Sequence, residues 1–125
     1  MKKMIFFCIS TFLFATIAIA QPSTEKQLRH VVLFKFKETA TPANTKMIED
    51  AFGKLPAQIK FIKGYEWGIN NSPEKLNDGL THCFIVTFTS EKDRNKYLIH
   101  PAHKVFVKLL GPYLQKAVVI DYWAK

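Results

Sequence analysis

The chain has 125 residues, a formal net charge of +8 and a 48% content of hydrophobic residues. This length is enough for one domain with a single modest core. Nucleic-acid-binding proteins cluster their basic residues on one face and interleave them with exposed aromatic residues. The lysines of this chain instead occur singly or in pairs along its whole length, so the composition argues against a nucleic-acid partner.

The N-terminus has the pattern of a secretory signal peptide. Lys2 and Lys3 are followed by an uncharged apolar run from Met4 to Ala20, and Ala18 and Ala20 supply the small residues of a cleavage site. We therefore predict a signal peptide over residues 1–20 and a secreted or periplasmic protein with no stable membrane anchor after cleavage. An uncleaved anchor is the alternative, because the run is just long enough to span a bilayer.

The rest of the chain reads as strands and helices that follow a flexible leader at residues 21–27. Residues 28–36 alternate with the two-residue period of a strand. Thr41 followed by Pro42 is typical of a helix start, and Pro56 ends or kinks that helix. Further strands are predicted at 61–69, 81–88 and 117–123, and a further helix at 91–99. The next helix is predicted to restart at His100-Pro101 and to continue to about Leu114, broken or ended near Gly111-Pro112.

The element order β-α-β-β-α-β predicts one α+β domain, residues 28–125, with a ferredoxin-like fold in which helices cover one face of an antiparallel sheet. The other face is then bare and apolar, and soluble monomers rarely leave such a patch exposed. We therefore predict a homodimer that pairs two sheet faces into a dimeric α/β barrel. Cys83 is the only cysteine outside the predicted signal peptide, so no disulfide forms within the mature chain. The bare face is predicted to carry Val31, Leu33, Cys83, Ile85, Val118 and Ile120.

Three of the four histidines are predicted to converge between the sheet and the helices. Two-residue alternation turns His30 and His82 toward the helices, and helical spacing places His103 on the apolar stripe that faces the sheet. Tyr97 lies just before the predicted helix break and reaches the same space. We therefore predict a pocket for a small organic molecule. The predicted walls include Val32, Phe34, Phe84 and Phe106.

Histidine and tyrosine in one pocket point to acid–base chemistry. A histidine in a partly dry pocket accepts a proton near neutral pH, and a tyrosine hydroxyl donates a hydrogen bond to a carbonyl oxygen that gains charge. This pair suits proton removal next to a carbonyl group, followed by aldol-type cyclisation or isomerisation, without a metal or a cofactor. The alternative is that each histidine is a hydrogen-bonded core residue, with His100 capping the helix that starts at Pro101.

Other kinds of site find little support in the sequence. The chain contains no phosphate loop, no dinucleotide fingerprint and no motif of a serine or cysteine nucleophile. His100 and His103 have a spacing that would suit a metal, but no carboxylate or thiolate is reliably placed beside them to complete the ligand set. We therefore expect no metal and no cofactor.

The sequence resembles the stress-responsive dimeric α/β-barrel (Dabb) family across almost all of the predicted mature chain. The resemblance rests on the strand from Arg29 to Phe36, on Thr81-His82, on the segment His100-Pro101-Ala102-His103 and on the closing residues Val119 to Tyr122. It implies a ferredoxin-like domain that dimerises through its sheet. The sequence also resembles, more distantly, the dimeric α/β-barrel monooxygenases.

One plant member of the Dabb family closes a polyketide ring by an aldol reaction and has a similar Y-x-x-H-P-A-H segment. This likeness implies catalytic roles for Tyr97 and His103 and a place in the substrate pocket for His30 and His82. Val107 and Leu114 replace a glycine and a tryptophan of that member, which implies a pocket of different shape. Two alternatives stay open: a non-catalytic stress-responsive dimeric module, and an activity like that of the related monooxygenases.

Overall fold

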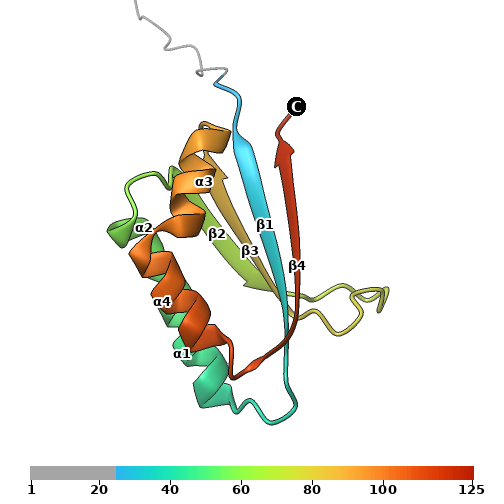
Figure 1. The fold of residues 1–125 in the computed structure, drawn as a ribbon. Helices are drawn as coiled ribbons and strands as arrows, with labels where there is room; N and C mark the ends of the chain where they lie inside the picture. Colours follow the sequence, from blue (N-terminus) through green and yellow to red (C-terminus); the bar gives the residue numbers. More distant parts are fainter. Residues whose placement is uncertain (1–24) are drawn as a thin grey trace, which may run out of the picture.

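The computed structural model describes residues 25–125, which form a four-stranded antiparallel sheet with helices on one face (Figure 1). The strand order is β2-β3-β1-β4, so the β-α-β-β-α-β order and the ferredoxin-like α+β fold expected from the sequence are confirmed. Each helical connection is split into two helices. The elements are β1 (Leu28–Phe36), α1 (Pro42–Gly53), α2 (Leu55–Gln58), β2 (Gly64–Ile69), β3 (His82–Phe88), α3 (Glu91–Ile99), α4 (Pro101–Leu110) and β4 (Leu114–Trp123).

The predicted signal peptide at residues 1–20 lies outside the described residues, as do residues 21–24 of the predicted leader. Residues 25–27 precede β1 without regular secondary structure. The carbonyl oxygen of Gln27 accepts a hydrogen bond from the backbone N–H of Ala124, with an N···O distance of 2.8 Å. Between residues 25 and 125, no helix has the length and the apolar character needed to cross a membrane.

Side-chain hydrogen bonds cap the start of α1. The hydroxyl of Thr41 accepts a hydrogen bond from the backbone N–H of Asn44, and the Asn44 side chain accepts one from the backbone N–H of Thr41. This capping box, with Pro42 at the first helical position, satisfies N–H groups that have no partner inside the helix. The helix ends at Gly53, and Pro56 lies in the first turn of α2 rather than inside α1.

Two strands begin three residues away from their predicted starts, and β3 begins at His82, one residue after its predicted start. β2 starts at Gly64 instead of residue 61, because residues before it turn: the backbone N–H of Ile62 donates to the carbonyl oxygen of Ile59. β4 starts at Leu114 instead of residue 117, since α4 already ends at Leu110 and a turn through Tyr113 follows. β2 is one of the two edge strands of the sheet, as its glycines indicate, and it pairs with β3 without a register shift.

The core lies between the sheet and the helices. Alternate positions of β1 are buried, which confirms the face assigned to His30, and the residues between them are half-buried. α1 and α4 contribute buried residues from the helix layer. The buried apolar residues of the core are Leu28, Val32, Phe34, Ile48, Phe52, Leu55, Ile59, Phe84, Val86, Phe88, Tyr97, Phe106 and Leu110.

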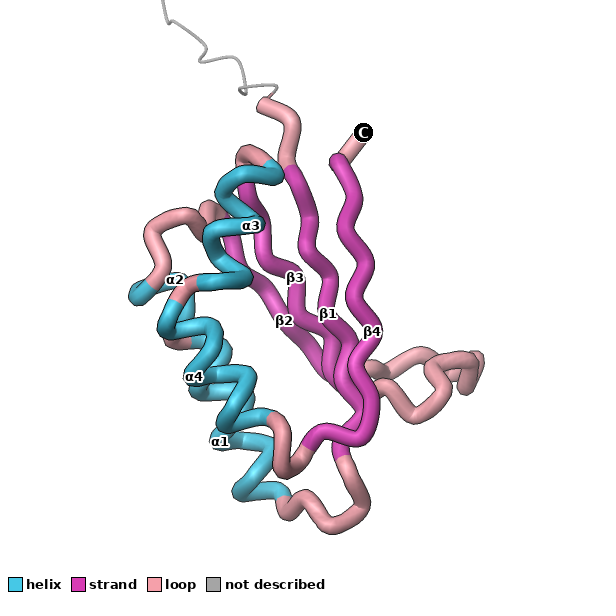
Figure 2. The backbone as a smooth tube through the Cα atoms, viewed as in Figure 1, coloured by secondary structure: helices cyan, strands magenta, loops and turns pink. Residues whose placement is uncertain are grey.

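The second face of the sheet is free of helices, as Figure 2 shows. We call it the open face. It carries the apolar residues that the sequence places there, and Ile120 is 53% exposed. The pairing register sets Val31 between Ile85 and Ile120, and Leu33 between Cys83 and Val118, so these six side chains form one continuous patch.

Candidate functional site

The site begins at the bend between α3 and α4. Ser90 caps α3, which ends at Ile99, and His100 then adopts an extended backbone with φ −64° and ψ 138°. The Nδ1 atom of His100 accepts a hydrogen bond from the backbone N–H of Ala102 at 3.1 Å, and Pro101 occupies the first position of α4. His100 is therefore the cap of α4, which is the structural alternative left open by the sequence.

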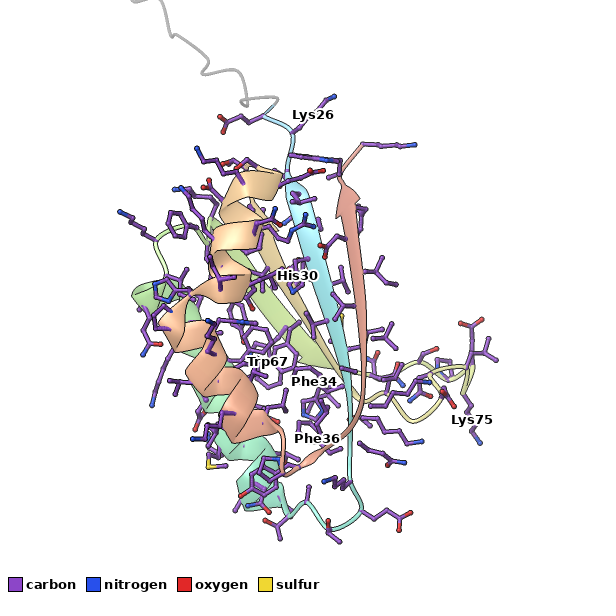
Figure 3. The ribbon with its side chains drawn as sticks, viewed as in Figure 1. Lys26, His30, Phe34, Phe36, Trp67 and Lys75 are labelled. Carbon is purple, nitrogen blue, oxygen red and sulfur yellow. The ribbon has the colours of Figure 1, made fainter. Side chains whose placement is uncertain are left out.

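This bend brings Tyr97 and His103 together. Their ring centroids lie 4.4 Å apart, although the two residues belong to different helices. Tyr97 is buried, with 1% of its surface exposed, and its ring also lies 5.7 Å from that of His30 on β1. Figure 3 shows His30 between the sheet and the helix layer. The structure thus brings together two of the three predicted histidines and the predicted tyrosine.

His103 has a defined tautomer in its neutral form. Its Nδ1 atom lies 3.1 Å from the backbone carbonyl oxygen of Leu98. A carbonyl oxygen only accepts hydrogen bonds, so Nδ1 carries the hydrogen and Nε2 carries the free lone pair. Burial of the ring, helped by the nearby His30 and His100, lowers the pKa of His103 below its ordinary value despite the bond to Leu98. His103 is therefore an unprotonated base at neutral pH.

The hydroxyl of Tyr97 stays protonated, in contrast to the imidazole of His103. Burial raises the pKa of its hydroxyl far above the ordinary value for tyrosine, and the nearby Tyr65 raises it further. The phenol therefore keeps its proton throughout the physiological pH range. A protonated hydroxyl beside an unprotonated imidazole gives the site one hydrogen-bond donor and one proton acceptor in contact.

His30 is fixed by residues that sequence reasoning did not identify. Its Nδ1 atom lies 2.6 Å from Asp121 Oδ1 on β4, and the second oxygen of that carboxylate contacts Arg94 of α3. A carboxylate accepts, so Nδ1 of His30 donates and the bond sets the orientation of the ring. The available signal was one acidic residue in the apolar closing strand, but only the pairing of β1 with β4 places Asp121 opposite His30.

These groups border a cavity of about 340 Å³ between the sheet and helices α3 and α4. The polar groups come from His30, Tyr97, His103 and Asp121, and the rest of the lining is apolar. Val107 and Leu114, which set the pocket shape in the sequence comparison, are both in the wall. The cavity is lined by His30, Val32, Phe34, Phe52, Tyr97, Leu98, His103, Phe106, Val107, Leu110, Leu114, Ala117, Val119 and Asp121.

His82 and Phe84 do not line this cavity, which corrects the prediction that three imidazoles converge. Both face the helices as expected, but β3 pairs with β1 so that His82 lies opposite Phe34 rather than His30. Four strand positions separate the two histidines, which is about 13 Å. The two-residue alternation determines which face of the sheet a side chain points to, whereas the pairing register determines which residue of the next strand lies beside it. The ring of Phe84 is instead stacked on that of Phe52, with centroids 4.4 Å apart.

His82 forms a separate buried cluster. Its Nε2 atom lies 2.9 Å from Glu49 Oε1 on α1, and its Nδ1 atom lies 2.8 Å from the hydroxyl oxygen of Thr81. The indole of Trp67 is stacked parallel to the imidazole, and Phe36 meets its edge. Both ring nitrogens of His82 are thus occupied by bonds inside the protein.

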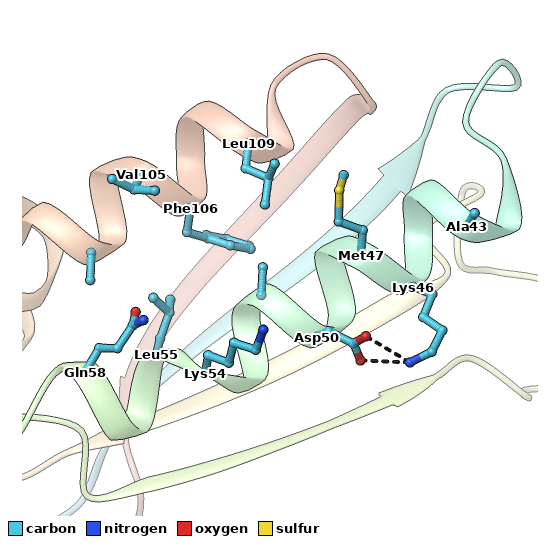
Figure 4. Close-up of a pocket in the computed structure, with 12 residues that line it drawn as sticks. Ala43, Lys46, Met47, Asp50, Lys54, Leu55, Gln58, Val105, Phe106 and Leu109 are labelled. Atoms are coloured by element: carbon cyan, nitrogen blue, oxygen red, sulfur yellow. Dashed lines mark hydrogen bonds and ion pairs between the residues drawn. The ribbon is translucent and has the colours of Figure 1, made fainter.

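Another hollow lies between α1 and α4 (Figure 4) and has a volume of about 530 Å³. Apolar residues such as Met47, Val105 and Leu109 line it, and the carboxylate of Asp50 is paired with Lys46. It contains no histidine or tyrosine, so it offers no acid–base pair. Within residues 25–125, no group of three or more histidine, cysteine or acidic side chains is arranged to hold a metal ion.

Comparison with known proteins places these features in a family. The family profile described as "Stress responsive A/B Barrel Domain" (Dabb) matches residues 28–124. The chain is 35% identical over 95 residues to the stress-response A/B barrel domain-containing protein HS1 of Arabidopsis thaliana, an alignment that covers 76% of this chain and 87% of HS1. It is 30% identical over 95 residues to olivetolic acid cyclase of Cannabis sativa, covering 76% and 94% of the two chains.

Solved structures with the same fold include an enzyme. The hydroxynitrile lyase of Passiflora edulis has a TM-score of 0.76 at 27% identity, and the match covers 81% of this chain and 95% of the lyase. A dimeric ferredoxin-like protein of unknown function from Thermobifida fusca has a TM-score of 0.68 at 24% identity, with 81% and 93% covered. The match along nearly the whole described domain decides the family: this chain belongs to the Dabb stress-responsive A/B barrel domains.

Proposed function

We propose that this protein is a homodimer that binds a small organic molecule between sheet and helices and catalyses cofactor-free acid–base chemistry next to a carbonyl group. The observation that carries the proposal is the contact between His103 and Tyr97, whose rings lie 4.4 Å apart in the wall of the cavity. One is an unprotonated base and the other a protonated donor. A cyclase and a hydroxynitrile lyase among the similar proteins also support small-molecule chemistry.

The reaction follows from these two protonation states. Nε2 of His103 removes a proton from a carbon next to a carbonyl group, and the electrons of the broken C–H bond move into an enolate. The hydroxyl of Tyr97 donates a hydrogen bond to the enolate oxygen, which stabilises its charge in surroundings of low polarity. The enolate carbon then attacks a second carbonyl group of the same molecule, and His103 returns its proton to the new alkoxide. Return of the proton to another carbon gives isomerisation.

The remaining cavity residues orient the ligand and keep water away. Asp121 holds the ring of His30, and the Nε2 atom of His30 is then free to bond a polar group of the ligand. Val32, Phe34 and Phe106 supply apolar walls. His82 and Phe84 support the fold next to these walls rather than the ligand.

Deuterium exchange tests the first step directly. The probe is acetophenone, whose methyl protons are next to a carbonyl group, incubated in D₂O with the purified protein and followed by NMR. We expect the wild type to exchange these protons and His103→Ala to lose about 100-fold or more of the rate, the range for a missing general base. Lys104→Ala is the matched control, because Lys104 is exposed on the same helix and does not line the cavity.

The outcomes separate the candidate functions. Exchange that His103→Ala leaves unchanged removes His103 from the reaction. A rise of the melting temperature with ligands from a set of carbonyl compounds and aromatic acids, without any exchange, assigns a binding module that does no chemistry. Neither exchange nor binding assigns the purely structural dimeric module.

The open face is the observation that supports the proposed homodimer. Its six apolar side chains form a continuous patch that no helix covers, and burial of such a surface contributes roughly 25 cal/mol per Å². Sedimentation velocity at several concentrations tests it, and a protein that stays monomeric at high concentration would contradict it. Ile85→Asp, which places a charge within the patch, is expected to shift the equilibrium toward monomers.

We also propose that the protein is exported and cleaved after Ala20. The basic residues Lys2 and Lys3, the apolar run and the small residues before position 21 support this. Mass spectrometry of the protein recovered from its natural cells tests it. A mature N-terminus at Gln21 is the expected result, and an intact N-terminus would exclude cleavage.

A further inference from the structure

The loop between β2 and β3 projects on the side of the sheet away from the helices (Figures 1 and 2). We call residues 70–81 the arm. Two contacts fix its side: the carboxylate of Asp78 lies 2.7 Å from the ammonium of Lys116, and Gly79 is covered by the side chain of Lys35. Lys35 and Lys116 are paired neighbours whose side chains belong to the open face. The arm therefore bends over one end of that face.

The arm has a defined shape rather than the conformation of a free loop. Lys75 and Asp78 adopt positive φ angles of 59° and 48°, a left-handed backbone that side chains other than glycine rarely take. The side-chain oxygen of Asn70 accepts from the backbone N–H of Ser72, and the side-chain amide of Asn77 donates to the carbonyl oxygen of Leu80. Gly79 has a φ of 74°, and an added Cβ would approach Lys35 to 2.7 Å.

This shaped arm presents one large apolar side chain to water. Leu76 is 82% exposed, the highest value among the large hydrophobic residues of the described chain. Figure 3 shows its neighbour Lys75 at the far end of the arm, away from the sheet. At this exposure the leucine is hardly buried by the contacts of its own protomer. Its position suits contact with another molecule.

A hollow of about 410 Å³ lies between the arm and the open face. Leu33, Gly68 and Cys83 of the sheet line it on one side, and Leu76, Asp78 and Leu80 of the arm line it on the other. Leu33 and Cys83 also belong to the apolar patch of the open face. The hollow and the patch are therefore one continuous surface, and any molecule seated on the patch is flanked by the arm.

We propose that the arm is a clasp for a second copy of this chain, with Leu76 packed against the partner protomer when two open faces meet. The occupant is a second copy because the clasp continues the surface that the proposed homodimer buries, on which this inference rests. In a two-fold dimer the same contact occurs twice, since each arm grips the opposite protomer. The clasp adds apolar contact at the rim of the interface and closes the hollow.

The test measures the dimer dissociation constant of the purified protein by sedimentation equilibrium. Leu76→Asp is expected to raise this constant about tenfold or more, because it places a charge in a buried contact. Val105→Asp is the matched control: Val105 is also highly exposed, at 69%, but it lies on α4, on the helix side of the sheet. We expect this control to leave the dissociation constant unchanged. Urea denaturation of each variant verifies that the monomer remains folded.

Hydrogen exchange gives an independent reading. Backbone amides of residues 74–77 are expected to exchange more slowly above the dissociation constant than below it. If the wild type and Leu76→Asp dimerise equally well, the clasp is overturned while the dimer stands. The same conclusion follows if the amides of the arm exchange at the same rate above and below the dissociation constant. A wild type that is monomeric at every concentration overturns the proposed dimer itself.

Discussion

Two buried histidines of this domain, both paired with a carboxylate, sit in contrasting surroundings. His30 bonds Asp121 through one nitrogen at 2.6 Å, and it borders the cavity that also contains Tyr97 and His103. His82 bonds Glu49 at 2.9 Å through one nitrogen and Thr81 at 2.8 Å through the other. The difference teaches that a carboxylate partner alone does not distinguish a cavity histidine from a structural one. The distinction lies in the second ring nitrogen, which is bonded inside the protein in His82.

Removing a single oxygen atom from the cavity region is expected to have a large effect, close to that of His103→Ala. Tyr97→Phe keeps the ring against His103 and takes away the hydroxyl that we propose stabilises the enolate. We expect kcat to fall about 100-fold with little change in KM, as for the loss of one oxyanion donor. Steady-state kinetics of proton exchange measures it. A fall in thermal stability with unchanged kcat would instead class Tyr97 with the structural cluster around His82.

The reverse pattern is expected for His82→Ala. This change leaves the Glu49 carboxylate without its donor and opens a gap beside Trp67, so the free energy of unfolding falls by about 2 kcal/mol. Proton exchange by the folded protein stays within about twofold, because His82 does not line the cavity. Urea denaturation and the exchange assay together measure the two quantities. Loss of exchange without loss of stability would contradict the division into two regions.

Asp121→Asn tests how much the hydrogen bond from His30 to the Asp121 carboxylate matters for the cavity. The amide still accepts a hydrogen bond from His30 but has no charge to pair with Arg94, so the ring of His30 is held less firmly. We expect about a tenfold loss of rate, typical of a residue that orients a functional histidine. Arg94→Met is the companion variant, and it is expected to have the smaller effect of the two, because the carboxylate remains.

The smallest effect is a pH dependence that belongs to the cavity. Burial lowers the pKa of His103, so protonation of the base begins below its ordinary value of 6.5. The exchange rate is therefore expected to be flat from neutral to mildly alkaline pH and to fall only as the pH drops below the ordinary histidine value of 6.5. The free energy of unfolding is also expected to fall as the pH drops, because the unfolded chain binds a proton at this residue more readily than the folded one. An alkaline fall near neutrality would contradict a protonated Tyr97.

The sequence alone predicts the fold almost completely, because its hydrophobic patterns are long enough to identify each strand and helix. Nine alternating residues in β1 reveal its two faces, and Ser90, Thr41 and the prolines mark the helix starts. The prediction is weaker where chain reversals lack a glycine or proline signal, as before Gly64, and where polar residues open a strand, as Gln115 and Lys116 do in β4.

The site was predictable only as far as its contacts are local. Tyr97 and His103 are neighbours in sequence, and the break at His100 predicts that they meet. The placement of His30 needs the register of three strands, which two-residue alternation leaves open. The same register separates His82 from the site and brings in Asp121.

The bend at His100 has one more consequence. In an unbroken helix, positions six residues apart point about 240° from one another, so Tyr97 and His103 would look to different sides. The interruption lets both rings meet, and seven consecutive residues therefore hold the whole reactive pair. The cavity walls come from other segments, among them β1, α1 and β4. Substitutions in those segments can therefore change the shape of the cavity without altering the residues that bring Tyr97 and His103 together.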